Sequence, residues 1–391
     1  MPELLFLLLP VAAAYGWFMG RNSAKHSELK GRANVTRNLS SGLNFLLTDQ
    51  EDKAIEQLLE LLDIEAATID TYLALANLFR RKGDWDKAIR IHEKLHQLSL
   101  PKPQAQQIQF ELAKDYFSAG IFDRAEKLLQ ELVKSDLLRE QVLKQLFSIF
   151  VATHDWHKAV ALTAQVEKTQ SKSLRIALAN IQSEALLASI TKVEAITDTP
   201  ANATDNSIAW QQLSDTYPMS VRPRFELATL YLAQQQHTQA KHCLLALLQQ
   251  KPQWSAEVLP LLAQCEFTAD EWYQLLTTLA EKQQNISARI YLADWLNEHG
   301  SSKAAEHFLL DKLRQQPSIR LFQKLLQLRQ QQSPVAAEVL SQVEDLVNAY
   351  LASKVLYSCR NCGFKTRQQY WLCPSCQQWE TVEPITGIDG R

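Results

Sequence analysis

Four of the six cysteines stand in two short pairs near the carboxy terminus. Each pair has the spacing C-x-x-C, and ten residues separate Cys362 of the first pair from Cys373 of the second. Two such turns can bring four thiolates to one tetrahedral centre, and their backbone N–H groups stabilise charge on sulfur. Four sulfur ligands suit either zinc or a single iron ion. The pattern predicts one metal ion, iron or zinc, on Cys359, Cys362, Cys373 and Cys376.

The segment around these cysteines has about 35 residues, too few to bury a core of its own, so the metal is expected to act as its core. Short strands are predicted at 357–359 and 370–373. Four aromatic side chains are expected to pack this module: Phe364, Tyr370, Trp371 and Trp379. Three roles stay open, namely a structural part docked on the last repeats of the chain, a protein-binding surface, or a redox or nucleic-acid element. Balanced basic and acidic residues argue against nucleic acid as a partner.

A second motif with metal-binding spacing is His92-Glu93-Lys94-Leu95-His96. The pattern H-E-x-x-H can place two imidazoles on one zinc, with a general-base glutamate between them. The further glycine and histidine of one large protease class would fall at Ser99 and Lys102 and are absent. The motif also lies in a predicted repeat helix. Since phosphate-binding glycine loops and nucleophile elbows are absent too, we expect neither catalytic nor cofactor-binding residues and no enzyme.

The elements that must position these residues are helical. The chain has 391 residues and a formal charge of −2, which gives no reason to expect a polyanion partner. Glycine occurs only 10 times, about 2.6% against a usual share of about 7%. Few tight turns are therefore available, and the abundant residues are strong helix formers. The composition predicts an all-α protein.

An internal repeat explains the helical composition. A small residue is followed three positions later by an aromatic residue and nine positions after that by alanine, as in Ala76, Phe79 and Ala88. The same pattern begins at residues 42, 113 and 228. From Ala54 to Ala88 is 34 positions, the tetratricopeptide period of two antiparallel helices. We predict a tetratricopeptide-repeat solenoid over 22–352, with unassigned register in 165–219 and a loop at 197–206.

Turns and isolated cysteines fit the same array. Gly83, Gly120 and Gly300 fall where the first helix of a repeat would end, and each is expected to take the left-handed conformation. Cys243 and Cys265 stand on predicted repeat helices and are expected to be buried apolar residues.

Four residues, three of them polar, share one face of the first helix of the second repeat at helical spacing. These residues are Leu73, Asn77, Arg80 and Arg81. They could clamp the chain of a partner protein, or they could simply form a solvated face.

The amino terminus has the pattern of a membrane anchor. Residues 4–20 carry no charge, and at 1.5 Å per residue they span about 25 Å, near the lower limit for crossing a bilayer. Basic residues follow from Arg21 to Arg37. The positive-inside rule then places the amino terminus outside and the rest in the cytoplasm, where disulfides are disfavoured. A cleaved secretory signal is the alternative, although a basic stretch before Leu4 is absent.

Four segments carry a resemblance to a known family. They are LLFLLLPVAAAYGWFMGR, ANLFRRKGDWDKAIRIHEKL, DYFSAGIFDRAEKLLQEL and CRNCGFKTRQQYWLCPSCQQWETVEPITGIDG. In this order they resemble the lipopolysaccharide assembly protein B family (LapB, YciM), with a rubredoxin-like tail. The resemblance implies three parts: a transmembrane anchor at 1–21, the repeats at 22–352 and a metal-binding domain at 353–391. It carries over the four tail cysteines as metal ligands, whereas Gln377 stands where rubredoxins usually have glycine.

The same resemblance implies a function. It suggests a single-pass inner-membrane protein, with a periplasmic amino terminus, that restrains lipopolysaccharide synthesis. Family members cooperate with the membrane protease FtsH in the degradation of LpxC, the lipid A deacetylase. A scaffold that gathers lipopolysaccharide enzymes without changing their turnover is the main alternative, and a redox or metal sensor is another. Formation of a homo-oligomer stays open.

Overall fold

The computed structural model describes Trp17 and residues 69–197, 203–282, 284–332 and 337–390. The expected anchor at 1–21, apart from Trp17, and the repeat beginning at residue 42 lie outside the described residues. Within the described ranges, no helix combines the length and the apolar character needed to cross a bilayer. The chain divides into two compact units, residues 1–149 and 150–391, which are described separately below.

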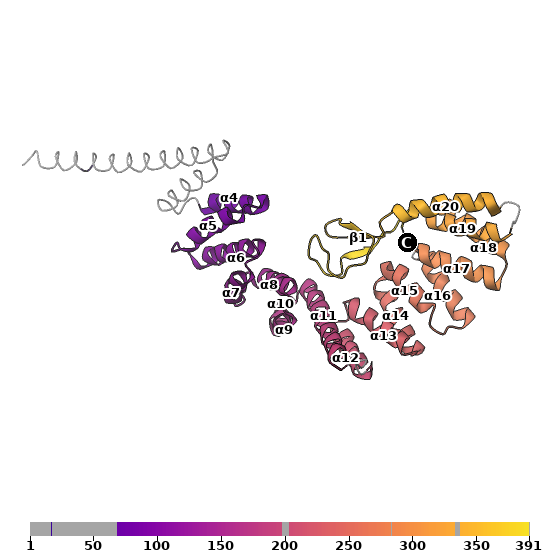
Figure 1. The fold of residues 1–391 in the computed structure, drawn as a ribbon, viewed down its shortest axis with the longest axis horizontal. Helices are drawn as coiled ribbons and strands as arrows, with labels where there is room; N and C mark the ends of the chain where they lie inside the picture. The colour runs from indigo at the N-terminus through magenta and orange to yellow at the C-terminus, as the bar shows by residue number, and fades with distance from the viewer. Residues whose placement is uncertain (1–16, 18–68, 198–202, 283, 333–336, 391) are drawn as a thin grey trace, which may run out of the picture. The chain divides into compact units, whose positions relative to one another are not determined.

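The described part of the first unit consists of helices, and the first four of them pack in sequence order (Figure 1). They are α4 (Ile69–Lys82), α5 (Trp85–His96), α6 (Lys102–Ser118), α7 (Phe122–Leu132) and α8 (Arg139–Thr153), which continues into the second unit. The alanines of the repeat pattern, such as Ala76 and Ala88, have no exposed surface. The aromatic residue of the pattern, Phe79, is 3% exposed beside them. Small residues therefore let the helices approach, and the aromatic ring fills the space between them, as predicted.

Glycines end a helix at the three predicted turns, but not all in the same way. Gly83 and Gly120 have φ angles of 94° and 76°, the predicted left-handed conformation. Gly300 instead has φ −118° and ψ −111°, so the prediction is wrong there. A Cβ atom at Gly300 would lie 2.9 Å from the Leu296 carbonyl oxygen. Glycine is needed at this turn because the chain passes close to that carbonyl group.

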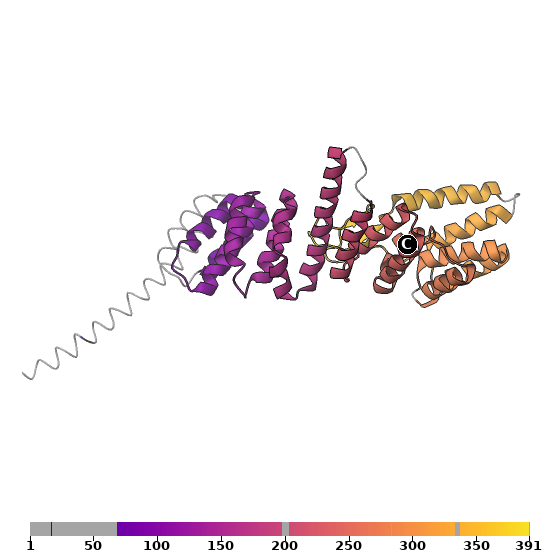
Figure 2. The same ribbon diagram turned by 90° about the horizontal axis from the view of Figure 1, so that it is seen from below.

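The second unit also consists mainly of helices, and these vary widely in length (Figure 2). Its helices are α9 (Trp156–Ala161), α10 (Thr163–Thr169), α11 (Lys172–Thr197), α12 (Ala203–Thr216), α13 (Arg222–Ala233), α14 (His237–Gln250), η2 (Pro252–Trp254), α15 (Ser255–Leu262), α16 (Ala269–Lys282), α17 (Ile286–His299), α18 (Ser302–Gln315), α19 (Ile319–Gln332) and α20 (Ala337–Ser353). The loop predicted at 197–206 is wrong at both ends, because α11 includes Thr197 and α12 begins at Ala203, while residues 198–202 lie outside the described residues. The sequence does not reveal the repeat register nearby, because the helix lengths depart from those of a regular repeat: α9 has 6 residues and α11 has 26.

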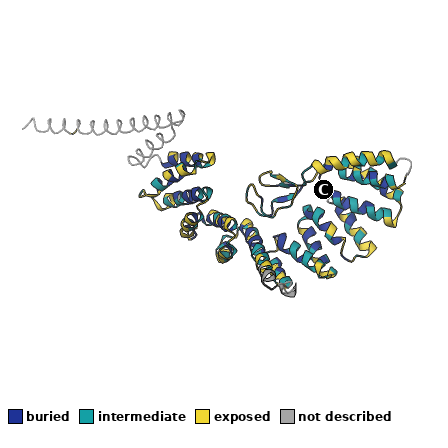
Figure 3. Ribbon diagram, in the orientation of Figure 1, coloured by how far each residue is buried: buried dark blue, intermediate teal, exposed yellow. Residues whose placement is uncertain are grey.

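The core of the second unit lies between consecutive helix pairs. Small residues let the helices approach in this unit as they do in the first. The alanines at these positions have no exposed surface: Ala228, Ala240, Ala293 and Ala305. By contrast, the terminal helix α20 buries only Leu351 among its seventeen residues, and Figure 3 shows most of its length exposed or half-buried. A single stripe of α20 therefore packs on α19, as expected for the last helix of a repeat array.

The cysteine segment forms a three-stranded antiparallel sheet of order β2-β1-β3. The strands are β1 (Tyr357–Cys359), β2 (Lys365–Thr366) and β3 (Val382–Pro384). The strand expected at 370–373 is not formed, and only one bridge joins Leu372 to Trp379 there. The backbone N–H of Cys373 instead donates to the carbonyl of Gln378 at 3.0 Å, because this part of the chain forms the second cysteine turn.

Candidate metal centre

The four cysteine sulfur atoms surround one common centre. All four Sγ atoms lie within 4.8 Å of one another. The Sγ atoms of Cys359 and Cys376 are 3.7 Å apart, and so are those of Cys362 and Cys373. A tetrahedral zinc ion with bonds of about 2.3 Å separates its sulfur ligands by about 3.8 Å. These two separations match those expected around one tetrahedral ion, so the four cysteines are placed to share it.

Two equivalent turns create this geometry. The N–H of Gly363 donates to the carbonyl of Cys359 at 2.9 Å, and the N–H of Gln377 donates to the carbonyl of Cys373 at the same distance. Gly363 and Gln377 both have positive φ, 75° and 53°. The departure from glycine at Gln377 therefore leaves the turn intact, although the left-handed conformation costs a non-glycine residue about 1 kcal/mol.

The four thiols have unequal surroundings. Cys373 and Cys359 are buried, whereas Cys362 is exposed. Burial acts to raise the pKa of Cys359, but hydrogen bonds with Thr381 and with the backbone N–H groups of Cys362 and Asn361 outweigh it and lower the pKa to about 6. Burial raises the pKa of Cys373 to about 12. The thiolate of Cys359 is thus stabilised by the protein itself, whereas Cys373 gains its charge most favourably from a bound cation.

A buried carboxylate attaches this metal module, residues 357–390, to the repeats. Glu380 is 6% exposed, and its oxygens accept the N–H of Val221 at 2.9 and 3.0 Å and the N–H of Arg222 at 3.3 Å. The Ser220 hydroxyl and the Asn180 amide also donate to it. These N–H groups belong to the start of α13, where backbone donors lack partners within the helix and the dipole favours a negative charge.

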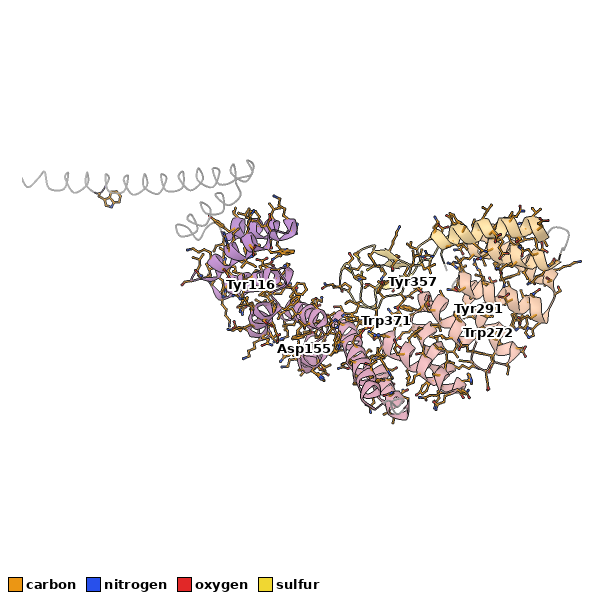
Figure 4. The ribbon with its side chains drawn as sticks, in the orientation of Figure 1. Tyr116, Asp155, Trp272, Tyr291, Tyr357 and Trp371 are labelled. Carbon is orange, nitrogen blue, oxygen red and sulfur yellow. The ribbon has the colours of Figure 1, made fainter. Side chains whose placement is uncertain are left out.

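Aromatic stacking strengthens the same junction. The rings of Trp371 and Trp254 are stacked, with centroids 5.2 Å apart and planes 10° apart. The Arg222 guanidinium carbon lies 5.7 Å from the centre of the Trp371 ring. Figure 4 labels Trp371 and, nearby, Tyr357, whose hydroxyl donates to Glu257 of α15. The module is therefore docked on the middle helices of the second unit. It also contacts the last repeats, which is one of the three roles that the sequence leaves open: the N–H of Ile319 donates to the carbonyl of Ile388, and the Tyr350 hydroxyl donates to Asp389.

The aromatic residues of the module behave differently from expectation. Phe364 packs against the core of the module as predicted. Trp371 instead joins the core of the repeats, and Tyr370 is 37% exposed. The docking roles of Trp371 and Glu380 could not be predicted from the sequence, and the one available signal was the number of large aromatic residues in so small a module.

The four predicted partner-binding residues have different surroundings in the structure. Arg80 forms ion pairs with Glu111 at 2.6 Å and Asp115 at 2.7 Å on α6, and it also donates to Asn77. Leu73 packs against the local core, while Arg81 is exposed. Asn77 and Arg80 therefore connect α4 to α6, and of the four side chains Arg81 is the most open to a partner.

The H-E-x-x-H motif is part of the same helix packing. His92 is fully buried with its Nδ1 atom against Asp115, and Glu93 accepts the hydroxyl of Tyr116. His96 is exposed. Within the described ranges, the four cysteines are the one group of three or more ligand atoms close enough to share an ion. His92 and Glu93 therefore serve as residues of a repeat helix.

Comparison with known proteins agrees with both parts of the structure. The family described as rubredoxin metal binding domain matches residues 357–384, and the tetratricopeptide repeat family matches residues 71–105. Among solved structures, the MamA protein has 17% identity and a TM-score of 0.34, covering 49% of this chain and 96% of its own.

Two curated relatives match over essentially their full length. Lipopolysaccharide assembly protein B of Escherichia coli strain K12 is 33% identical and is covered completely, as is this chain. The protein of the same name from Haemophilus influenzae is 32% identical, with 99% of each chain covered. The repeats, the four-cysteine module and this full-length similarity together show that the chain belongs to the lipopolysaccharide assembly protein B family.

Proposed function

We propose that this chain is a non-enzymatic adaptor of lipopolysaccharide assembly that promotes FtsH-dependent proteolysis of the lipid A deacetylase LpxC. The observation that carries the proposal is the docking of the metal module on the repeats through Glu380. A rigid repeat surface with a metal-stabilised module attached to it suits the presentation of one protein to another. The names of the full-length relatives support the pathway.

The proposal includes a place in the cell. Residues 1–21 would anchor the chain in the inner membrane, with the amino terminus in the periplasm and the repeats in the cytoplasm. The uncharged run at 4–20 and the basic residues after it support this orientation. An anchor beside a membrane protease raises the effective concentration of adaptor and substrate without any new contact.

The proposal also includes the metal. Cys359, Cys362, Cys373 and Cys376 would hold one zinc or iron ion, because the sulfur separations fit a tetrahedral centre. In either case the ion serves to hold the module in the form that docks on α13.

The half-life of LpxC after a block of translation tests the function. We expect depletion of this protein to lengthen the half-life several-fold, and the wild-type chain to restore it. A Glu380→Ala chain, present at the same level, should restore it poorly. An unchanged half-life on depletion would refute the adaptor and favour a scaffold that leaves enzyme turnover alone.

A further inference from the structure

A cavity lined by no residue of the metal module lies in the second unit, between the loop after α15 and the helices α16 and α17. Its volume is about 540 Å³, within the range of about 300–1,000 Å³ typical of ligand sites. Trp272 of α16 and Tyr291 of α17 line it, and Figure 4 labels both. Neither the comparisons nor the proposed function gives this cavity a role.

Aromatic rings in several orientations form its walls. Phe267 and Trp272 have centroids 4.9 Å apart, and Trp272 and Tyr291 are 6.1 Å apart at nearly a right angle. Trp295 also lines the cavity and stacks on His299. Rings set at an angle to one another present electron-rich faces from more than one side, which is the arrangement that attracts a cation.

The carboxylates of the cavity add negative charge. Asp294 and Glu298 both line it. Asp294 is paired with Lys324, whereas the exposed Glu298 has no ion pair within the part of the chain that the structure describes. Burial raises the pKa of Tyr291, and the charge of Asp294 adds to the effect. Both carboxylates lie toward the carboxyl end of α17, which carries the negative end of the helix dipole.

At the edge of the cavity, an aromatic ring and a carboxylate already bind a cation that belongs to the chain itself. The ammonium group of Lys241 lies 3.9 Å from the centre of the Phe267 ring and 2.8 Å from a carboxylate oxygen of Glu271. One aromatic face and one carboxylate together hold this cation. The lining of the cavity contains the same two kinds of group again, in the rings of Trp272 and Tyr291 and the carboxylate of Glu298, without a lysine of the chain on them among the described contacts.

We propose that this cavity binds the lysine or arginine side chain of an extended segment of a partner protein. An apolar occupant would desolvate the unpaired carboxylate of Glu298 without compensation. A cation matches both the aromatic faces and the unpaired Glu298. The volume accommodates a long basic side chain with part of its neighbours, and helical repeat arrays present such surfaces to peptides. The site does not depend on the proposed function, because its binding is measured without any protease.

Fluorine NMR of the full-length chain in detergent micelles, labelled with 5-fluorotryptophan, tests the proposal. Replacing each tryptophan by phenylalanine assigns the signals. The probes are acetyl-Gly-X-Gly-amide peptides in which X is lysine, arginine or norleucine. We expect the lysine and arginine peptides to shift the Trp272 and Trp295 signals saturably, without moving that of the distant Trp210. The norleucine peptide should bind about tenfold more weakly.

Charge variants and a small amine complete the test. Glu298→Gln alters an exposed side chain and should weaken lysine-peptide binding about threefold. The matched control Glu338→Gln, an exposed carboxylate on α20, should leave binding unchanged. Equal binding of the norleucine peptide, or an unchanged affinity in Glu298→Gln, would overturn the cation site. Binding of butylammonium without binding of the lysine peptide would refute the proposal that the occupant belongs to a partner protein.

Discussion

Both carboxylate oxygens of Glu380 accept the backbone N–H of Val221, at 2.9 and 3.0 Å, across 159 positions of sequence. The acceptor belongs to the metal module and the donor to the start of α13. A carboxylate in this place completes the hydrogen bonding of a helix end that is buried in the molecule. One side chain of the module therefore accepts hydrogen bonds from several donors of the repeats at once.

Replacing Glu380 by alanine should destabilise the second unit. The change removes the acceptor of several buried donors, and leaving such groups unsatisfied costs about 3 kcal/mol in total. Urea unfolding followed by tryptophan fluorescence measures the loss. Glu338→Ala on α20 is the matched control, because this carboxylate is exposed. An unchanged unfolding midpoint in Glu380→Ala would show that the contact contributes nothing to stability.

Replacing Cys373 by serine should remove the metal and unfold the module. Cys373 has no exposed surface, and a module of this size depends on its metal for folding. Elemental analysis should find about one zinc or iron ion per wild-type chain and almost none in the variant. Cys265→Ser, a buried thiol outside the cluster, should keep the ion. A metal-loaded Cys373→Ser chain would contradict the assigned ligand set.

Stability of the first unit should fall in acid partly through Glu111. Burial acts to raise the pKa of Glu111, but Lys114 and Arg80 outweigh it, so the pKa lies below the ordinary value. The unfolded chain, with a glutamate pKa of about 4.3, therefore binds this proton more readily. The stabilisation is complete above the unfolded pKa and is lost as the pH falls through the folded pKa.

Glu111→Gln should accordingly show a smaller loss of stability between neutral and acidic pH than the wild type. Urea midpoints measured at pH 7 and below pH 4 give the comparison. Asp123→Asn, which removes one exposed carboxylate from α7, controls for the change in net charge. If Glu111→Gln and wild type lost stability equally, the ion pairs of Glu111 would not contribute to the acid response.

Replacing each of two neighbouring arginines should change the stability of the protein to very different extents. Arg80→Gln breaks the ion pairs with Glu111 and Asp115, and because Asp115 is fully buried the loss should be about 3 kcal/mol. Arg81→Gln changes an exposed side chain and should alter stability by less than about 0.5 kcal/mol. Thermal unfolding compares them. Equal destabilisation by the two variants would contradict the assigned roles, whereas a stable Arg81→Gln chain offers a clean test of partner binding.

The sequence predicts the parts of this molecule that depend on local spacing. Ala76 and Ala88 are close in sequence and pack one helix on the next, so their period reveals the repeats. Cys359 and Cys362 are likewise fixed by a four-residue turn. Glu380 and Trp371 could not be placed in the same way, because their partners Val221 and Trp254 lie more than one hundred residues earlier. No periodicity joins such distant residues, and only the folded chain shows them together.

The contacts of Glu380 also affect how the second unit folds and deforms. In a simple repeat array each repeat touches only its neighbours, so the array bends easily and can fold from any point. The hydrogen bonds from Asn180 and Val221 to Glu380 join residues 200 and 159 positions apart. They close a long loop of chain, whose formation costs entropy and slows folding. Once formed, this cross-link should make α11 to α15 and the metal module resist bending and unfold together.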